Sequence, residues 1–89
     1  MANYMLVRQE VKDYSVWKRG YDAHRPKRVE AGLAEKSILQ GTDDPHEVVV
    51  LFEADDLDRA KAFAKSADLR QTMAKAGVSN QPDITYLHD

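Results

Sequence analysis

The sequence contains no cysteine among its 89 residues, so a disulfide framework, a thiolate metal site and a cysteine nucleophile are all excluded. Its four glycines are scattered and form no glycine-rich phosphate loop. The three histidines, His24, His46 and His88, lack the short spacing of a metal-binding motif. We therefore expect neither a metal nor a cofactor. Hydrophobic residues make up 43% of the chain, which suffices for one core, and we predict a single domain over residues 1–89.

Long apolar runs are also missing. No segment approaches the roughly 20 apolar residues of a membrane span. The first residues, Met1 to Arg8, reach a charge after a few apolar positions, unlike a signal peptide. We expect a cytoplasmic protein without a membrane partner. A net charge of -2 offers no general attraction to a polyanion, and we predict no nucleic-acid partner.

Hydrophobic patterning indicates four strands and two helical regions. Asp13 is a candidate N-cap for the first helical region and Ser66 for a second helix within the later one. Pro26 predicts a kink or break near Arg25 because it removes a backbone donor and clashes with the preceding turn. Gly77 is a candidate residue just after the end of the last helix. The expected strands are residues 4–11, 33–40, 47–54 and 84–88.

This order predicts an α+β fold of the ferredoxin-like βαββαβ kind, with a four-stranded antiparallel sheet and helices on one face. The run Val48 to Phe52 is apolar on both faces, which favours a central strand. Since the helices cover only one face of the sheet, the other is left apolar and open. We therefore expect a homodimer that pairs through its sheet faces.

Five segments carry a likeness to a known family, and these are residues 10–18, 24–28, 44–52, 68–70 and 76–78. Together they resemble small stand-alone proteins of the dimeric α/β-barrel superfamily, specifically the antibiotic biosynthesis monooxygenase-like proteins. The resemblance implies two sheets paired across a two-fold axis into a barrel, and in each subunit a cavity for a hydrophobic or aromatic ligand between sheet and helices. The activities it implies are varied and include cofactor-independent oxygenases, haem proteins and isomerases.

The candidate site residues lie on one face of the first helical region. Trp17 and Tyr21 would form an aromatic wall for a planar ligand, with Tyr86 and His88 reaching toward it from the last strand. His24 is the candidate general acid or base, and Arg28 would hold developing negative charge. The alternative is an aromatic core pair capped by polar groups at the helix end, which is the commoner role of an aromatic stripe at helical spacing.

Three functions remain open at this point. The first is a small-molecule-binding protein or cofactor-independent enzyme, of the monooxygenase or isomerase kind, acting on an aromatic or polyketide-like compound. The second is a non-enzymatic homodimeric stress or interaction domain. The third is haem binding, for which His24 is the only helical ligand candidate. The substrate and the existence of turnover do not follow from the residues.

Overall fold

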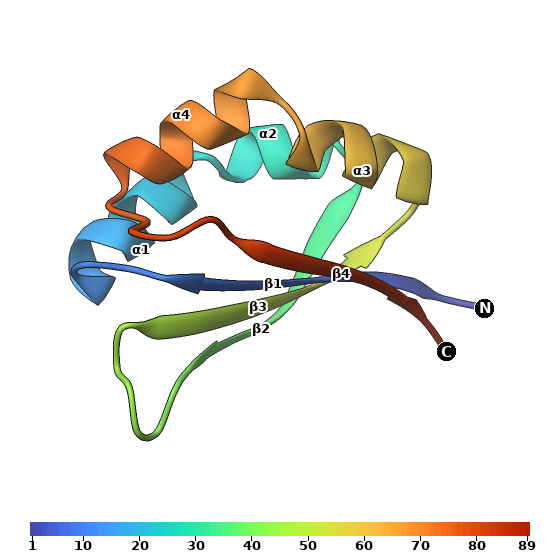
Figure 1. Ribbon diagram of the computed structural model, residues 1–89. Helices are drawn as coiled ribbons and strands as arrows, with labels where there is room; N and C mark the ends of the chain where they lie inside the picture. Colours follow the sequence, from blue (N-terminus) through green and yellow to red (C-terminus); the bar gives the residue numbers. More distant parts are fainter.

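The computed structural model describes all 89 residues and contains four strands and four helices in the order β1-α1-α2-β2-β3-α3-α4-β4 (Figure 1). The strands are β1 (Asn3–Glu10), β2 (Leu33–Gln40), β3 (Glu47–Ala54) and β4 (Asp83–His88). The helices are α1 (Tyr14–Ala23), α2 (Arg25–Glu30), α3 (Leu57–Ala64) and α4 (Ala67–Lys75).

The strands form one antiparallel sheet in the order β2-β3-β1-β4. All four helices lie over the same face of this sheet, and the opposite face carries no element of the chain (Figure 1). The predicted ferredoxin-like α+β fold is therefore confirmed, and β3 is a central strand as its apolar run indicated. No helix is long and apolar enough to cross a bilayer.

The core lies between the helices and the covered face of the sheet. Along β3, Val48, Val50 and Phe52 are buried, whereas Val49 and Leu51, which point the other way, are half-buried. On β1, Met5 pairs with Phe52 in the register, so their side chains share the covered face. The alternation expected for a sheet with one covered face is confirmed.

The helix starts follow the predicted capping residues. The Asp13 carboxylate accepts hydrogen bonds from the backbone N–H groups of Ser15 and Val16 at the start of α1. Ser66 Oγ accepts one from the N–H of Leu69 at the start of α4. The break predicted near Arg25 is also confirmed, since α1 ends at Ala23 and α2 begins at Arg25.

A β-bulge in β2 explains its irregular pattern of apolar residues. Glu35 pairs with Phe52 and Ser37 with Leu51, so Lys36 is an extra residue on its strand. The insertion reverses the alternation beyond it. Leu33, before the bulge, and Ile38, five residues later, consequently both pack against the core.

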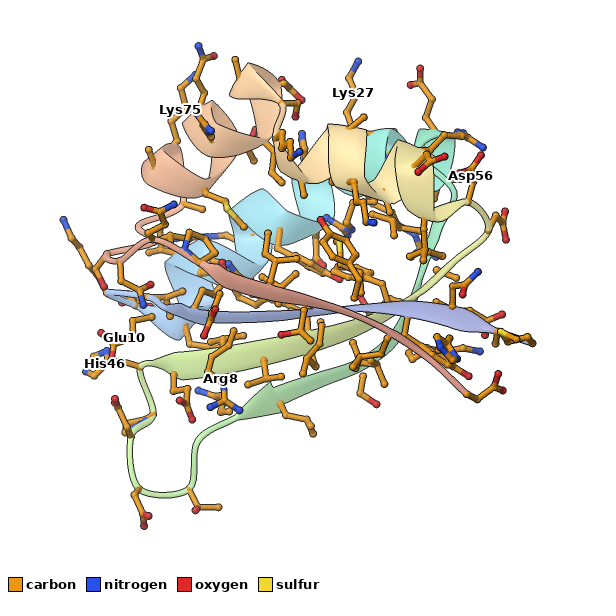
Figure 2. The ribbon with its side chains drawn as sticks, turned by 45° about the vertical axis from the view of Figure 1, so that its right-hand side comes forward. Arg8, Glu10, Lys27, His46, Asp56 and Lys75 are labelled. Atoms are coloured by element: carbon orange, nitrogen blue, oxygen red, sulfur yellow. The ribbon has the colours of Figure 1, made fainter.

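The open face of the sheet is partly apolar. Its exposed residues include Leu39, which is 59% exposed, and Leu87, which is 42% exposed. Figure 2 shows Arg8 on this side of the sheet, whereas Lys27 and Lys75 project from the outer surface of the helices.

Candidate functional site

A cavity lies between the covered face of the sheet and the helices. The structure brings four of the predicted site residues together in its wall, and these are Trp17, Tyr21, His24 and Arg28. The rest of the wall is largely apolar, with Val50 and Phe52 from β3 and Leu69 and Met73 from α4 among its residues. Residues spaced three and four apart in the first helical region therefore share one face, even though the region is broken between α1 and α2.

Aromatic rings form one side of the cavity. Trp17 is 2% exposed and stacks on Tyr21, with their ring centroids 4.8 Å apart and an interplanar angle of 27°. Tyr21 in turn stacks on Phe52 at a centroid distance of 6.4 Å. Offset stacks of this kind provide a flat apolar wall.

The phenol of Tyr21 is held in its neutral form. Its hydroxyl donates a hydrogen bond to Glu35 Oε1 at 2.8 Å. Burial first, and then this hydrogen bond to a carboxylate, raise the pKa of Tyr21 far above its ordinary value. Tyr21 is therefore a hydrogen-bond donor and a wall of the cavity, not a base at neutral pH.

Arg28 is a buried cation at the α2 end of the cavity, with 6% exposure. Its guanidinium carbon lies 3.6 Å from the Tyr21 ring centroid, and Nη1 donates to the backbone carbonyl of Tyr21. Burial lowers the pKa of Arg28 from its ordinary value, although the group stays protonated at neutral pH. No carboxylate forms an ion pair with this guanidinium.

His24 lies at the junction of α1 and α2, where it is linked to α4. Its Nε2 donates to Asp68 Oδ2 at 2.8 Å, and its ring stacks on Phe63 with 5.7 Å between centroids. The hydrogen bond from His24 lowers the pKa of the Asp68 carboxyl. With the proton on Nε2, the lone pair of a neutral imidazole is on Nδ1, and a carboxylate–imidazole pair of this kind is suited to proton transfer.

Gln9 is a site residue that the sequence reasoning missed. It lies on β1 with its side chain on the covered face and is 2% exposed within the cavity wall. Its Oε1 has no hydrogen-bond partner. A signal was present in the sequence, since Met5, Val7, Gln9 and Val11 alternate along one strand face, and a polar residue at such a core position breaks the pattern.

Tyr86 and His88 do not join the cavity. Tyr86 faces the helices from β4 opposite Met5, and it lines a separate groove of about 520 Å³ beside α4. Burial raises its pKa, and Lys61 Nζ lies 5.4 Å from its ring centroid. His88 is exposed at the end of β4, so the expectation that it reaches the aromatic wall is wrong. Of the β4 residues on the covered face, only Ile84, the register partner of Val7, lines the cavity.

The groove and the cavity share a boundary. Leu69 and Met73 of α4 and Ile84 of β4 line both spaces. Helix α4 has no buried residue of its own. The cavity is therefore separated from the groove by a few side chains on a lightly anchored helix.

The cavity volume is about 50 Å³. An apolar cavity of about 150 Å³ holds one benzene molecule, so an aromatic ligand requires the cavity to widen. A haem does not fit this space, and His24 Nε2, a usual haem-binding nitrogen, is bonded to Asp68. No group of three or more potential metal-ligating side chains comes together.

The sheet order and the placement of the helices on one face are shared with several solved structures. A proposed antibiotic biosynthesis monooxygenase from Bordetella bronchiseptica superposes with a TM-score of 0.80 at 14% identity, over 99% of this chain and 96% of that one. A proposed monooxygenase of the same kind from Nitrosomonas europaea gives 0.72 at 19% identity, over 99% and 89%.

A third similar structure is SnoaB, a cofactor-independent oxygenase from Streptomyces nogalater, with a TM-score of 0.74 at 10% identity, over 99% of this chain and 92% of that one. The sequence matches no protein-family model and no curated protein. At these identities the likeness shows a shared fold, and the chemistry has to be argued from the site.

Proposed function

We propose that this protein binds a small aromatic or polyketide-like compound between its sheet and helices and acts on it as a cofactor-independent enzyme. The observation that carries the proposal is the convergence of a flat aromatic wall, a histidine–carboxylate pair and a buried arginine without an ion-pair partner on one apolar cavity. Structures with this fold include a cofactor-independent oxygenase, which supports the same class of function.

The proposed chemistry begins with proton transfer. Nδ1 of His24 removes an acidic C–H or O–H proton from the ligand, while Asp68 stabilises the imidazolium that forms. The guanidinium of Arg28 stabilises the negative charge left on the ligand oxygen. An isomerase returns the proton at another atom, whereas an oxygenase uses dioxygen as a second substrate for the same anion.

The ligand enters, on this proposal, by outward displacement of α4. The groove beside that helix then becomes continuous with the cavity, because Leu69, Met73 and Ile84 separate the two. Tyr86 lines the groove and becomes part of the ligand-binding surface in the widened site. Trp17 and Tyr21 supply the surface inside the cavity on which the ligand stacks.

Deuterium exchange at the benzylic C1 of 2-tetralone in D₂O tests the proton transfer directly. We expect the protein to accelerate exchange and the His24→Asn variant to lose about a hundredfold or more of that acceleration, as removal of a general base does. The His88→Asn variant removes an exposed histidine and should behave as the wild type. Equal rates in the wild type and His24→Asn would contradict the proposed role of His24, and dioxygen uptake would separate oxygenase from isomerase.

The second candidate function is a non-enzymatic homodimeric domain. The small volume of the cavity and the two contacts of Arg28 with Tyr21 favour it. If this alternative holds, the Arg28→Ala variant should unfold at a markedly lower denaturant concentration than the wild type, because the arginine side chain is then part of the packed core. If Arg28 serves the ligand, the same change leaves stability close to that of the wild type.

We also propose that the protein is a homodimer paired through the open sheet faces. Leu6 and Leu51 are register partners in the middle of this face, and Leu39 and Leu87 are exposed toward its edges. Apolar sheet faces of this kind are usually covered in solution.

A cysteine-free chain needs no oxidising compartment, which supports a cytoplasmic location.

A further inference from the structure

Gln9 is the one residue with a buried side-chain nitrogen or oxygen that lacks a hydrogen-bond partner. The residue is 2% exposed, and its register neighbour on β3, Val48, is fully buried and apolar. Its side chain belongs to the wall of the cavity. A polar group that is removed from water without a partner is destabilising, so such groups in folded proteins usually have an explanation.

A ligand in the cavity would explain the unpaired amide oxygen of Gln9, because the ligand could provide the missing hydrogen-bond partner. The unpaired atom is a carbonyl oxygen, which accepts a hydrogen bond and cannot donate one. The nearby wall is formed by stacked aromatic rings, which suit a flat ligand. A ligand that matches both features is planar and carries an O–H donor at its edge.

We propose that Gln9 is the recognition group for the hydroxyl of a phenolic or enolic aromatic ligand. This inference rests on the proposed function, because it requires an aromatic ligand in the cavity, and it narrows the ligand to the hydroxylated class. Gln9 acts here in binding and orientation, and the proton-transfer step remains with His24. An aromatic compound of the same shape without the donor leaves the amide oxygen unpaired and binds less well for that reason.

Phenol and toluene form a suitable pair of probes, since they have nearly the same shape and differ in the donor. Trp17 is the only tryptophan and lines the cavity, so its indole N–H signal in a ¹H–¹⁵N NMR spectrum reports ligand binding. The quantity of interest is the toluene Kd divided by the phenol Kd. Taking this ratio in each variant removes the different hydrophobicities of the two probes.

The test variant is Gln9→Met, which keeps an unbranched side chain of similar length but removes the hydrogen-bonding groups. We expect the ratio to fall about three- to tenfold relative to the wild type, as the loss of one net hydrogen bond implies. The matched control is Met5→Leu, which alters the same wall without changing its hydrogen bonding. That variant should change both affinities alike and leave the ratio unaltered.

The outcomes separate this inference from the proposed function. An unchanged ratio in Gln9→Met, with both probes still shifting the Trp17 signal, overturns the role of Gln9 and leaves the aromatic ligand site standing. A fall of similar size in Met5→Leu also overturns it, since wall shape would then explain the effect. If neither probe shifts the Trp17 signal of the wild type, both proposals fall. Gln9→Leu provides a second apolar replacement should Gln9→Met not give a folded spectrum.

Discussion

Tyr21 connects the parts of the candidate site at the scale of single residues. Its ring contacts Trp17 on one side and the guanidinium of Arg28 on another, and its hydroxyl donates to Glu35. The neutral phenol is a requirement of this arrangement, because an anion would be poorly solvated there and would face the Glu35 carboxylate. The raised pKa of Tyr21 therefore has a consequence for stability at alkaline pH.

Replacement of Tyr21 by Phe should change the alkaline limb of the stability curve. The folded-state pKa of Tyr21 lies above its ordinary value of 10.0, so its contribution is fully present below pH 10.0 and is lost as the pH rises above that value. At neutral pH we expect Tyr21→Phe to cost about 1 kcal/mol for the lost hydrogen bond. Above pH 10.0 the difference from the wild type should shrink in chemical denaturation measured at each pH.

The control for this experiment is Tyr4→Phe, which removes a phenol from the open sheet face and keeps Tyr21. That variant should retain the alkaline loss of stability shown by the wild type. A constant difference between the wild type and Tyr21→Phe across the alkaline range would mean that the buried phenol ionises as readily in the folded as in the unfolded chain.

At the scale of helices and strands, the features that depend on neighbouring residues could be predicted from the sequence. Asp13, Ser66 and Pro26 act on backbone groups within a few residues of themselves, so the helix starts and the α1–α2 break followed from local chemistry. The meeting of Trp17, Tyr21, His24 and Arg28 in one wall followed from helical spacing in the same way.

Other features depended on contacts between distant segments. Asp68, the partner of His24, lies 44 residues away in the chain, and no local pattern links the two. The bulge at Lys36 shifts β2 against β3, and strand register places Tyr86 in the groove instead of the cavity. The sequence does show Gln9 as a polar residue on an otherwise apolar strand face. That its Oε1 lacks a hydrogen-bond partner can be seen only in the three-dimensional structure.

The hydrogen bond between His24 and Asp68 is the polar side-chain link between the α1–α2 junction and α4. Because the folded-state pKa of Asp68 is lowered, its stabilising contribution is present above the ordinary Asp value and is lost as the pH falls through the lowered value. We expect Asp68→Asn to speed hydrogen exchange of the α4 amides at neutral pH. The difference from the wild type should disappear on acidification.

Asp58→Asn is the matched control for the Asp68 variant. Asp58 occupies the first turn of α3, as Asp68 does in α4, but its side chain has no histidine partner. The control therefore removes a similar favourable interaction with the helix dipole without breaking a link between helices. Equal effects of the two variants on α4 exchange would show that the link to His24 does not hold this helix.

At the scale of the whole molecule, the proposed homodimer depends on the open face of the sheet. Four helices cover one side of the sheet (Figure 1). By strand register, the other side carries leucine and valine residues on three neighbouring strands. If two such faces pair, each subunit keeps its own cavity on the far side, so ligand binding and dimerisation use opposite faces of the same sheet. The two properties are then separable by mutation.

Leu51→Lys places a charge in the middle of the open face and should convert the dimer to a monomer. Sedimentation equilibrium at micromolar concentration is expected to give twice the chain mass of 10.1 kDa for the wild type and the single-chain mass for this variant. The control Val29→Lys introduces the same charge at a 62%-exposed site on α2 and should remain dimeric. A wild type that sediments at the single-chain mass would contradict the sheet-face dimer. Retained binding of the phenol probe by monomeric Leu51→Lys would show that the cavity is complete within one chain.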